Sequence, residues 1–215
     1  MSSLTGRSRR AAALPRPGKT GIRSSRFTLW LLLALPALWL LRRYGSEQVL
    51  AMDLLRPSGE MAVRLMVLAL LPGPLSELFG PGRLLRAWLR IRRNLGVAAF
   101  AYALLHLLIY FVDMAALAAI VGEMTLPGIW TGWLALLLMA VPAAISSDRA
   151  VRALGRRWKR LQRLVYPALA LTFAHWLLLD HGWSSAAVHA MPIMLAWSLR
   201  GLRRLERRPA EGTSP

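Results

Sequence analysis

The 215-residue chain is 56% hydrophobic and carries a formal net charge of +18 at pH 7. A soluble nucleic-acid-binding protein can be as basic, but its apolar residues do not gather into long uncharged runs as they do here. The sequence has no cysteine, which excludes a disulfide framework, a zinc–thiolate site and a thiolate-held iron–sulfur cluster. Apolar runs separated by arginine clusters predict a multi-pass membrane protein rather than a basic soluble helical bundle.

The predicted elements follow one another from a basic N-terminus. Residues 1–26 are rich in Ser, Arg and Pro and are typical of a disordered tail. Most of the apolar segments after it approach the ~20 residues that a helix needs to cross the hydrocarbon of a bilayer. They predict six helices, over residues 27–41, 61–78, 95–117, 127–146, 161–179 and 184–200. The first segment lacks a small-residue cleavage site after it, so we expect a retained helix rather than a signal peptide. No internal repeat is visible in the sequence.

The distribution of arginine predicts the topology. Basic residues concentrate in the N-terminal tail, in the loops after the second and fourth segments, and in the C-terminal tail. The positive-inside rule therefore predicts an all-α, six-helix transmembrane domain at 27–201, with 1–26 and 202–215 in the cytoplasm. Four arginines fall on the outer side, against this trend: Arg42, Arg43, Arg56 and Arg64. The clusters are typical of topology signals and anionic-lipid contacts, and an acidic cytoplasmic partner or a flavin phosphate is the alternative.

Two of the four histidines lie inside apolar segments. His106 lies eleven residues into the third segment and His175 fourteen residues into the fifth, counted from the cytoplasmic side. At 1.5 Å per residue these depths are roughly 17 and 21 Å, so the imidazoles are expected at similar heights on two helices. Two axial ligands on opposite faces of one haem need this arrangement. The alternatives are a histidine hydrogen-bonded to a neighbouring helix and a proton relay.

Three further side chains complete the candidate cofactor site or flank it. Thr172 lies about one turn from His175 and is a candidate acceptor for the ring N–H, which would select the tautomer. Arg64 lies near the outer end of the second segment and is a candidate partner for the anionic haem propionates; the alternative is snorkelling to the interface. His181 and His189 lie at the outer side and are expected to be surface histidines.

Two stretches carry a family resemblance, and a third carries it more loosely. They are "RRNLGVAAFAYALLHLLIY" (92–110), "ISSDRAVRALGRRWKRLQRLVYPALALTFAHWLLL" (145–179) and, loosely, "GEMAVRLMVLALLPGPL" (59–75). They resemble the MsrQ or YedZ family, the haem-binding membrane subunits of bacterial periplasmic methionine-sulfoxide reductase systems, within the ferric-reductase-like transmembrane superfamily.

The resemblance implies the cofactors and the partners. It implies six helices in a bacterial inner membrane and b-type haem, with His106 and His175 at the family's histidine positions. Flavin mononucleotide and quinone are further candidate cofactors. Electrons would pass from quinone or a cytoplasmic flavin reductase to a periplasmic molybdopterin enzyme that reduces methionine sulfoxide. The chain is thus expected to be an electron-transfer subunit of an oxidoreductase rather than a stand-alone enzyme.

One position departs from the family pattern. The family reads W-x-x-L-H-x-x-V-Y, whereas this chain reads "WKRLQRLVY", with Gln162 in place of a histidine. Glutamine is a poor haem ligand, so we expect one haem, about 20 Å from the cytoplasmic surface by helix rise. Two alternatives stay open: a divergent ferric-reductase-like haem protein with another acceptor, and a haem-free membrane scaffold.

Overall fold

The computed structural model describes residues 19–46, 49–179 and 182–206, and all regular elements in these ranges are helices. The chain divides into two compact units between Leu35 and Pro36, and each unit is described by itself. Helix α1 (Lys19–Gly45) contributes to both units. It begins inside the segment expected to be a disordered tail, so the helix starts earlier than predicted. The rest of that tail, residues 1–18, lies outside the described residues, as does 207–215.

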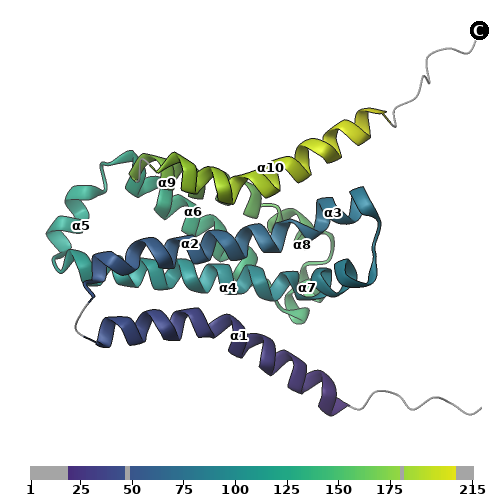
Figure 1. The fold of residues 1–215 in the computed structure, drawn as a ribbon, viewed down its shortest axis with the longest axis horizontal. Coiled ribbons are helices and arrows are strands. Elements are labelled where there is room, and N and C mark those ends of the chain that lie inside the picture. The colour runs from purple at the N-terminus through teal and green to yellow at the C-terminus, as the bar shows by residue number, and fades with distance from the viewer. Residues whose placement is uncertain (1–18, 47–48, 180–181, 207–215) are drawn as a thin grey trace, which may run out of the picture. The chain divides into compact units, whose positions relative to one another are not determined.

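The second unit is built around two helix pairs. Its described helices are α2 (Ala51–Leu70), α3 (Pro72–Phe79), α4 (Arg83–Met114), α5 (Leu117–Glu123), α6 (Pro127–Ala144), α7 (Asp148–Leu154), α8 (Arg156–Gln162), α9 (Val165–Leu179) and α10 (Trp183–Glu206). The most extensive packing joins α2 with α4, which run side by side in Figure 1, and α6 with α9. Contacts between α4 and α6 join the two pairs, and α10 packs against α2, α3 and α9.

The all-helical prediction is confirmed for the described residues, and the number of membrane spans is confirmed only in part. Four helical stretches are long and apolar enough to cross a membrane: Phe27–Gly45, Ala51–Phe79, Arg83–Met114 and Pro127–Ala144. They correspond to the first four predicted segments. The six-span count and the cytoplasmic position of both termini stay predictions.

The fifth predicted segment, 161–179, is divided by a proline. Pro167 has no N–H, and within a continuous helix its ring would collide with the carbonyl of Arg163. The chain therefore closes by tighter turns, in which Leu164 N donates to Leu161 O and Tyr166 N donates to Arg163 O, both at 3.1 Å. Helix α9 consequently begins at Val165 and has 15 residues, about 22 Å of length.

A second proline is compensated by a side chain of another helix. Pro72 lacks the N–H that would bond to Leu68 O four residues earlier. The indole Nε1 of Trp88, on α4, donates to this carbonyl at 2.9 Å. The bond satisfies the freed oxygen and ties α4 to the junction of α2 and α3.

Small side chains let the first helix pair approach closely. Ala62 on α2 and Ala98 and Ala99 on α4 are buried, together with the larger Met66 and Tyr102. Small residues at a helix–helix contact are typical of membrane bundles, where packing rather than water exclusion drives association. Large apolar side chains instead lie exposed on the outer faces, as expected for helices surrounded by lipid; examples are Leu68, Leu108, Leu134 and Leu137.

Candidate functional site

The two histidines inside the apolar segments lie next to each other. His106 on α4 and His175 on α9 have ring centroids 6.1 Å apart, with the ring planes at 88°. One histidine comes from each helix pair. The structure therefore brings together the two residues that their depth in the sequence singled out.

Backbone carbonyls select the tautomer of each ring. Nδ1 of His106 lies 2.9 Å from Leu55 O, and Nδ1 of His175 lies 2.6 Å from Gly128 O. A carbonyl oxygen only accepts hydrogen bonds, so each Nδ1 carries the proton and donates it. Each Nε2 then keeps a lone pair, and neither Nε2 has a hydrogen-bond partner among the described residues. A bonded Nδ1–H with a free Nε2 is the state in which histidine binds a metal.

A glycine lies against each imidazole. A Cβ added at Gly59 would lie 3.3 Å from Cε1 and Nδ1 of His106, and one added at Gly132 would lie 2.6 Å from Nδ1 of His175. At Gly132 this distance is shorter than Cβ atoms tolerate, so a side chain there requires the ring to move. The two glycines thus allow each ring to reach the backbone of the helix on which it packs.

A buried hydroxyl precedes each glycine. Ser58 and Thr131 are the two buried polar side chains in the described part of the chain. Ser58 Oγ donates to Leu55 O at 2.8 Å, and Thr131 Oγ1 shares its proton between Pro127 O at 2.8 Å and Gly128 O at 2.9 Å. Each carbonyl therefore accepts both from a hydroxyl on its own helix and from the imidazole. On α2 and on α6 the same local pattern recurs: a carbonyl, a hydroxyl three residues later and a glycine four residues later.

The two helix pairs line one cavity, here called the histidine cavity. The lining residues of one pair have the same sequence spacing as those of the other pair. On α2 the lining residues include Gly59 and those three, four and seven positions after it, and α6 lines the cavity at the same offsets from Gly132. On α4 they include His106 and those at offsets −3, +1 and +4, and α9 lines it at the same offsets from His175. The cavity volume is about 730 Å³. Cofactor sites commonly span about 300–1,000 Å³.

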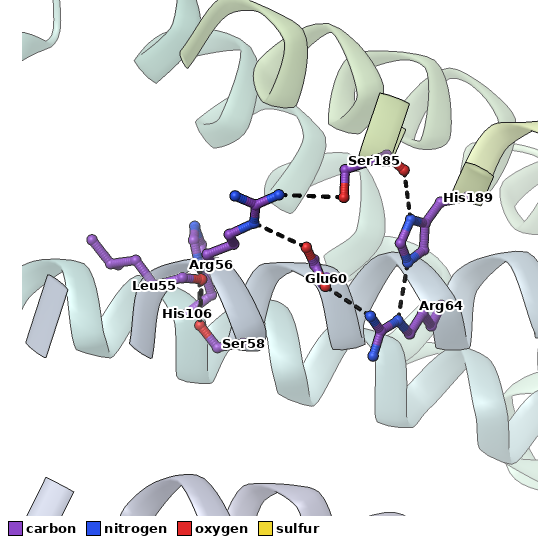
Figure 2. Close-up of polar contacts among 8 residues, drawn as sticks. All are labelled: Leu55, Arg56, Ser58, Glu60, Arg64, His106, Ser185 and His189. Carbon is purple, nitrogen blue, oxygen red and sulfur yellow. Dashed lines mark hydrogen bonds and ion pairs between the residues drawn. The ribbon is translucent and has the colours of Figure 1, made fainter. Parts of the chain in front are cut away.

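Charged side chains at one edge of the histidine cavity form the network drawn in Figure 2. Arg56 and Glu60 line the cavity, and Arg56 Nε donates to Glu60 Oε1 at 3.1 Å. The other oxygen of Glu60 accepts from Arg64 Nη2 at 2.7 Å. Arg64 Nε donates to His189 Nε2 at 3.0 Å, and His189 Nδ1 donates to Ser185 O at 2.7 Å. Arg64 is thus engaged by Glu60 and His189, and Arg56 is the arginine of this network that lines the cavity.

Thr172 lines the histidine cavity without bonding to the nearby imidazole. Its hydroxyl donates to Ala168 O at 2.8 Å, whereas the ring N–H of His175 is accepted by Gly128 O. The tautomer role expected of Thr172 therefore belongs to Gly128. His189 lies on α10, outside the histidine cavity, and His181 lies outside the described residues.

A second cavity of about 550 Å³, here called the basic cavity, lies between the same helix pairs. Met66 and Met139 line both cavities. Gln162 lines the basic cavity, and its Nε2 donates to Pro142 O at 3.1 Å, close to the C-terminus of α6. This glutamine lies thirteen residues before His175, and the residue thirteen before His106 is Arg93. The basic cavity therefore has no imidazole at either corresponding position.

Sequence reasoning missed Gly59, Gly132 and Arg56 as parts of the site. The available signal for the glycines was a Ser-Gly dipeptide just before the second apolar segment and a Thr-Gly dipeptide inside the fourth. Without the structure nothing connects either dipeptide with a histidine more than forty residues away.

Comparisons with known proteins bear on the same segments. A family model described as "Ferric reductase like transmembrane component" matches residues 58–173. A "Protein-methionine-sulfoxide reductase heme-binding subunit MsrQ" of Brucella anthropi is 33% identical over 213 residues, which cover 93% of this chain and 94% of that protein. The proteins of the same name from Brucella ovis and Brucella canis are 34% identical over 224 residues, which cover 98% of this chain and 94% of each relative.

Proposed function

Because this chain belongs to the MsrQ family of ferric-reductase-like transmembrane proteins, we propose that it is a membrane electron-transfer subunit with one b-type haem between His106 and His175. Its relatives are named heme-binding subunits of a protein-methionine-sulfoxide reductase. The observation that carries the proposal is the 6.1 Å spacing of two imidazoles whose Nδ1 atoms both donate to backbone carbonyls.

The residues present fit a metal-centred cofactor. Two imidazoles with centroids 6.1 Å apart, each with Nδ1 bonded to a carbonyl and Nε2 without a partner among the described residues, could together hold one metal ion. The cavity volume of about 730 Å³ suits an organic cofactor rather than a bare ion. When bound, haem supplies one-electron chemistry, and the axial ligands and the hydrogen bonds behind them tune its potential.

The polar groups of the histidine cavity have different roles in this proposal. His106 and His175 would hold the iron through Nε2, and the carbonyls of Leu55 and Gly128 orient the two rings. Arg56 is the cation placed to face an anionic propionate, since it lines the cavity.

Arg64 and Thr172 take indirect parts. Arg64 acts through Glu60, which it shares with Arg56 as a partner. Thr172 forms part of the cavity wall.

The electron path is the next part of the proposal. Electrons arrive from quinone or a cytoplasmic flavin reductase and leave to a periplasmic molybdopterin subunit that reduces protein methionine sulfoxide. The names of the relatives support the sulfoxide system. Six membrane crossings with both termini in the cytoplasm follow from the arginine distribution. Flavin mononucleotide stays a prediction from the sequence resemblance, and the single haem is inferred from Gln162.

Spectroscopy of the purified protein tests the haem proposal. The full chain is purified in detergent and its haem content and reduced-minus-oxidised spectrum are measured. We expect about one haem per chain, with b-type bands that disappear in His106→Ala and in His175→Ala. His189→Ala is the histidine control: this imidazole lies outside the histidine cavity and accepts from Arg64, so its loss should shift the bands at most slightly and should not abolish them.

Two results would contradict the proposal. Both alanine variants could retain the bands of the unsubstituted protein, or the chain could contain no haem after expression with haem supplied. Haem-free protein of ordinary stability would favour the membrane-scaffold alternative. A haem protein that fails to reduce the molybdopterin partner would favour another acceptor.

A further inference from the structure

The basic cavity gathers positive charge without matching negative charge. Five basic side chains line it: Arg90, Arg92, Arg93, Lys159 and Arg163. Its described lining contains no acidic residue. Arg93 forms an ion pair with Asp148 at 2.7 Å, whereas Arg92, Lys159 and Arg163 have no carboxylate partner within the described ranges. Like charges around one space repel each other, so an anion in that space is favoured.

Three neutral donors of the basic cavity are already hydrogen-bonded to the protein. Gln162 Nε2 donates to Pro142 O at 3.1 Å, and Ser146 Oγ donates to the same carbonyl at 2.6 Å. Trp158 Nε1 donates to Ile145 O at 3.1 Å. These three donors are therefore engaged within the protein, and the groups left for a ligand are the cations and the Tyr166 hydroxyl. That composition favours an anionic head over a neutral quinone.

The remaining wall of the basic cavity is apolar. Met66 and Leu70 contribute from α2, Leu89 from α4, Met139 from α6 and Val165 from α9. Cations beside an apolar wall match a ligand with an anionic head and a hydrocarbon body. A flavin ring would also need several hydrogen-bond partners along its polar edge, whereas the donors of Ser146, Trp158 and Gln162 are engaged elsewhere.

We propose that the basic cavity binds the phosphate headgroup of an acidic phospholipid, with its hydrocarbon chains along the apolar wall. Basic pockets between membrane helices recognise anionic headgroups by this combination of features. The proposal is independent of haem binding, because none of the five cations lines the histidine cavity. It is also independent of which membrane face the cavity opens toward.

The test compares lipid binding by the full chain and by two charge-matched triple variants. Arg92→Gln/Lys159→Gln/Arg163→Gln removes three cations of the basic cavity. Arg149→Gln/Arg152→Gln/Arg157→Gln removes three cations of α7 and α8 that do not line it. Each protein is placed in nanodiscs of phosphatidylcholine with or without phosphatidylglycerol, and lipid retained after detergent extraction is measured by native mass spectrometry.

The unsubstituted chain and the control triple are expected to retain phosphatidylglycerol at least about tenfold over phosphatidylcholine. The cavity triple is expected to lose that preference. Melting temperatures in phosphatidylcholine show whether both triples fold. If the cavity triple does not fold, Arg92→Gln and Lys159→Gln are measured singly, each with a smaller loss expected.

Four outcomes would overturn the proposal. The control triple could lose as much preference as the cavity triple, which would indicate general surface charge. The unsubstituted chain could retain both lipids equally. Inorganic phosphate could displace the lipid as well as phosphatidylglycerol does, which would indicate a free-anion site. Flavin mononucleotide could compete with the lipid in the unsubstituted chain and fail to bind the cavity triple, which would make the occupant a flavin phosphate.

Discussion

Substitution of Gly132 by alanine probes the contact on which the site geometry depends. The added Cβ would lie 2.6 Å from Nδ1 and 2.7 Å from Cε1 of His175. Ordinary contact begins at 3.4 Å, so the ring must retreat by about 0.8 Å. Nδ1 is also held 2.6 Å from Gly128 O on the same helix, so the retreat stretches or breaks that hydrogen bond.

The expected cost follows from these two effects. Overpacking a filled site costs about 1–3 kcal/mol. Loss of a buried hydrogen bond costs a further ~0.5–1.5 kcal/mol. Alanine regains roughly 0.5–1 kcal/mol because glycine is a poor helix former. We therefore expect Gly132→Ala to lower the free energy of unfolding by about 0.5–4 kcal/mol.

Alanine substitutions at two other glycines serve as comparisons for this measurement. At Gly59 the nearest His106 atoms lie 3.3 Å from the added Cβ, so a shift of a few tenths of an ångström suffices and the net effect should be close to zero. At Gly201, in the last part of α10, nothing lies within 4 Å, and alanine should stabilise by up to about 1 kcal/mol.

Denaturant unfolding of the three variants in one detergent gives the order of stabilities, and haem retention gives a second readout. Gly132→Ala should be the least stable and should lose the most haem. If Gly132→Ala were as stable as Gly201→Ala and kept its haem, the imidazole of His175 would not pack on this glycine, and the reasoning would be wrong.

Three further substitutions test other parts of the structure. Trp88→Phe leaves Leu68 O without its indole partner and should destabilise the protein by about 1–2 kcal/mol, measured by thermal unfolding; no change would mean that another donor reaches this carbonyl. Ser147→Ala removes the side-chain acceptor at the N-terminus of α7 and should cost about 1 kcal/mol, seen as faster amide exchange confined to α7. Gln162→His introduces an imidazole into the basic cavity, but the corresponding position on α4 is Arg93, so haem content should stay at one per chain; a second haem would refute the single-site interpretation.

Similar heights for His106 and His175 were expected from the sequence because helical rise converts residue number into height. Each count started at the basic end of an apolar segment, and both segments start on the same side in the predicted topology. The structure places the two rings 6.1 Å apart. The residues facing the rings could not be predicted in this way, because they depend on how each helix is rotated against its neighbour. Gly59 and Gly132 therefore became visible only in the packed structure.

The effect of a proline on helix continuity could not be predicted from hydropathy. An apolar run such as 161–179 has the composition of one helix, and nothing in its hydropathy distinguishes a continuous helix from two. Pro167 removes an amide and crowds the preceding turn, so the segment divides into α8 and α9. At Gln162 the sequence pattern identified a missing histidine, whereas the structure shows an amide that bonds to Pro142 O near the end of α6.

The shared wall of the two cavities links their electrostatics. Met66 and Met139 are the only described side chains that line both cavities. The wall that the cavities share is therefore apolar, with no charged side chain in it. Electrostatic interactions are strong across an apolar wall because its dielectric constant is low. The cations of the basic cavity therefore favour the reduced, less positive form of a redox group held by the imidazoles. An acidic lipid that neutralises the cations would lower the reduction potential. The composition of the surrounding bilayer would then set how readily this protein accepts an electron.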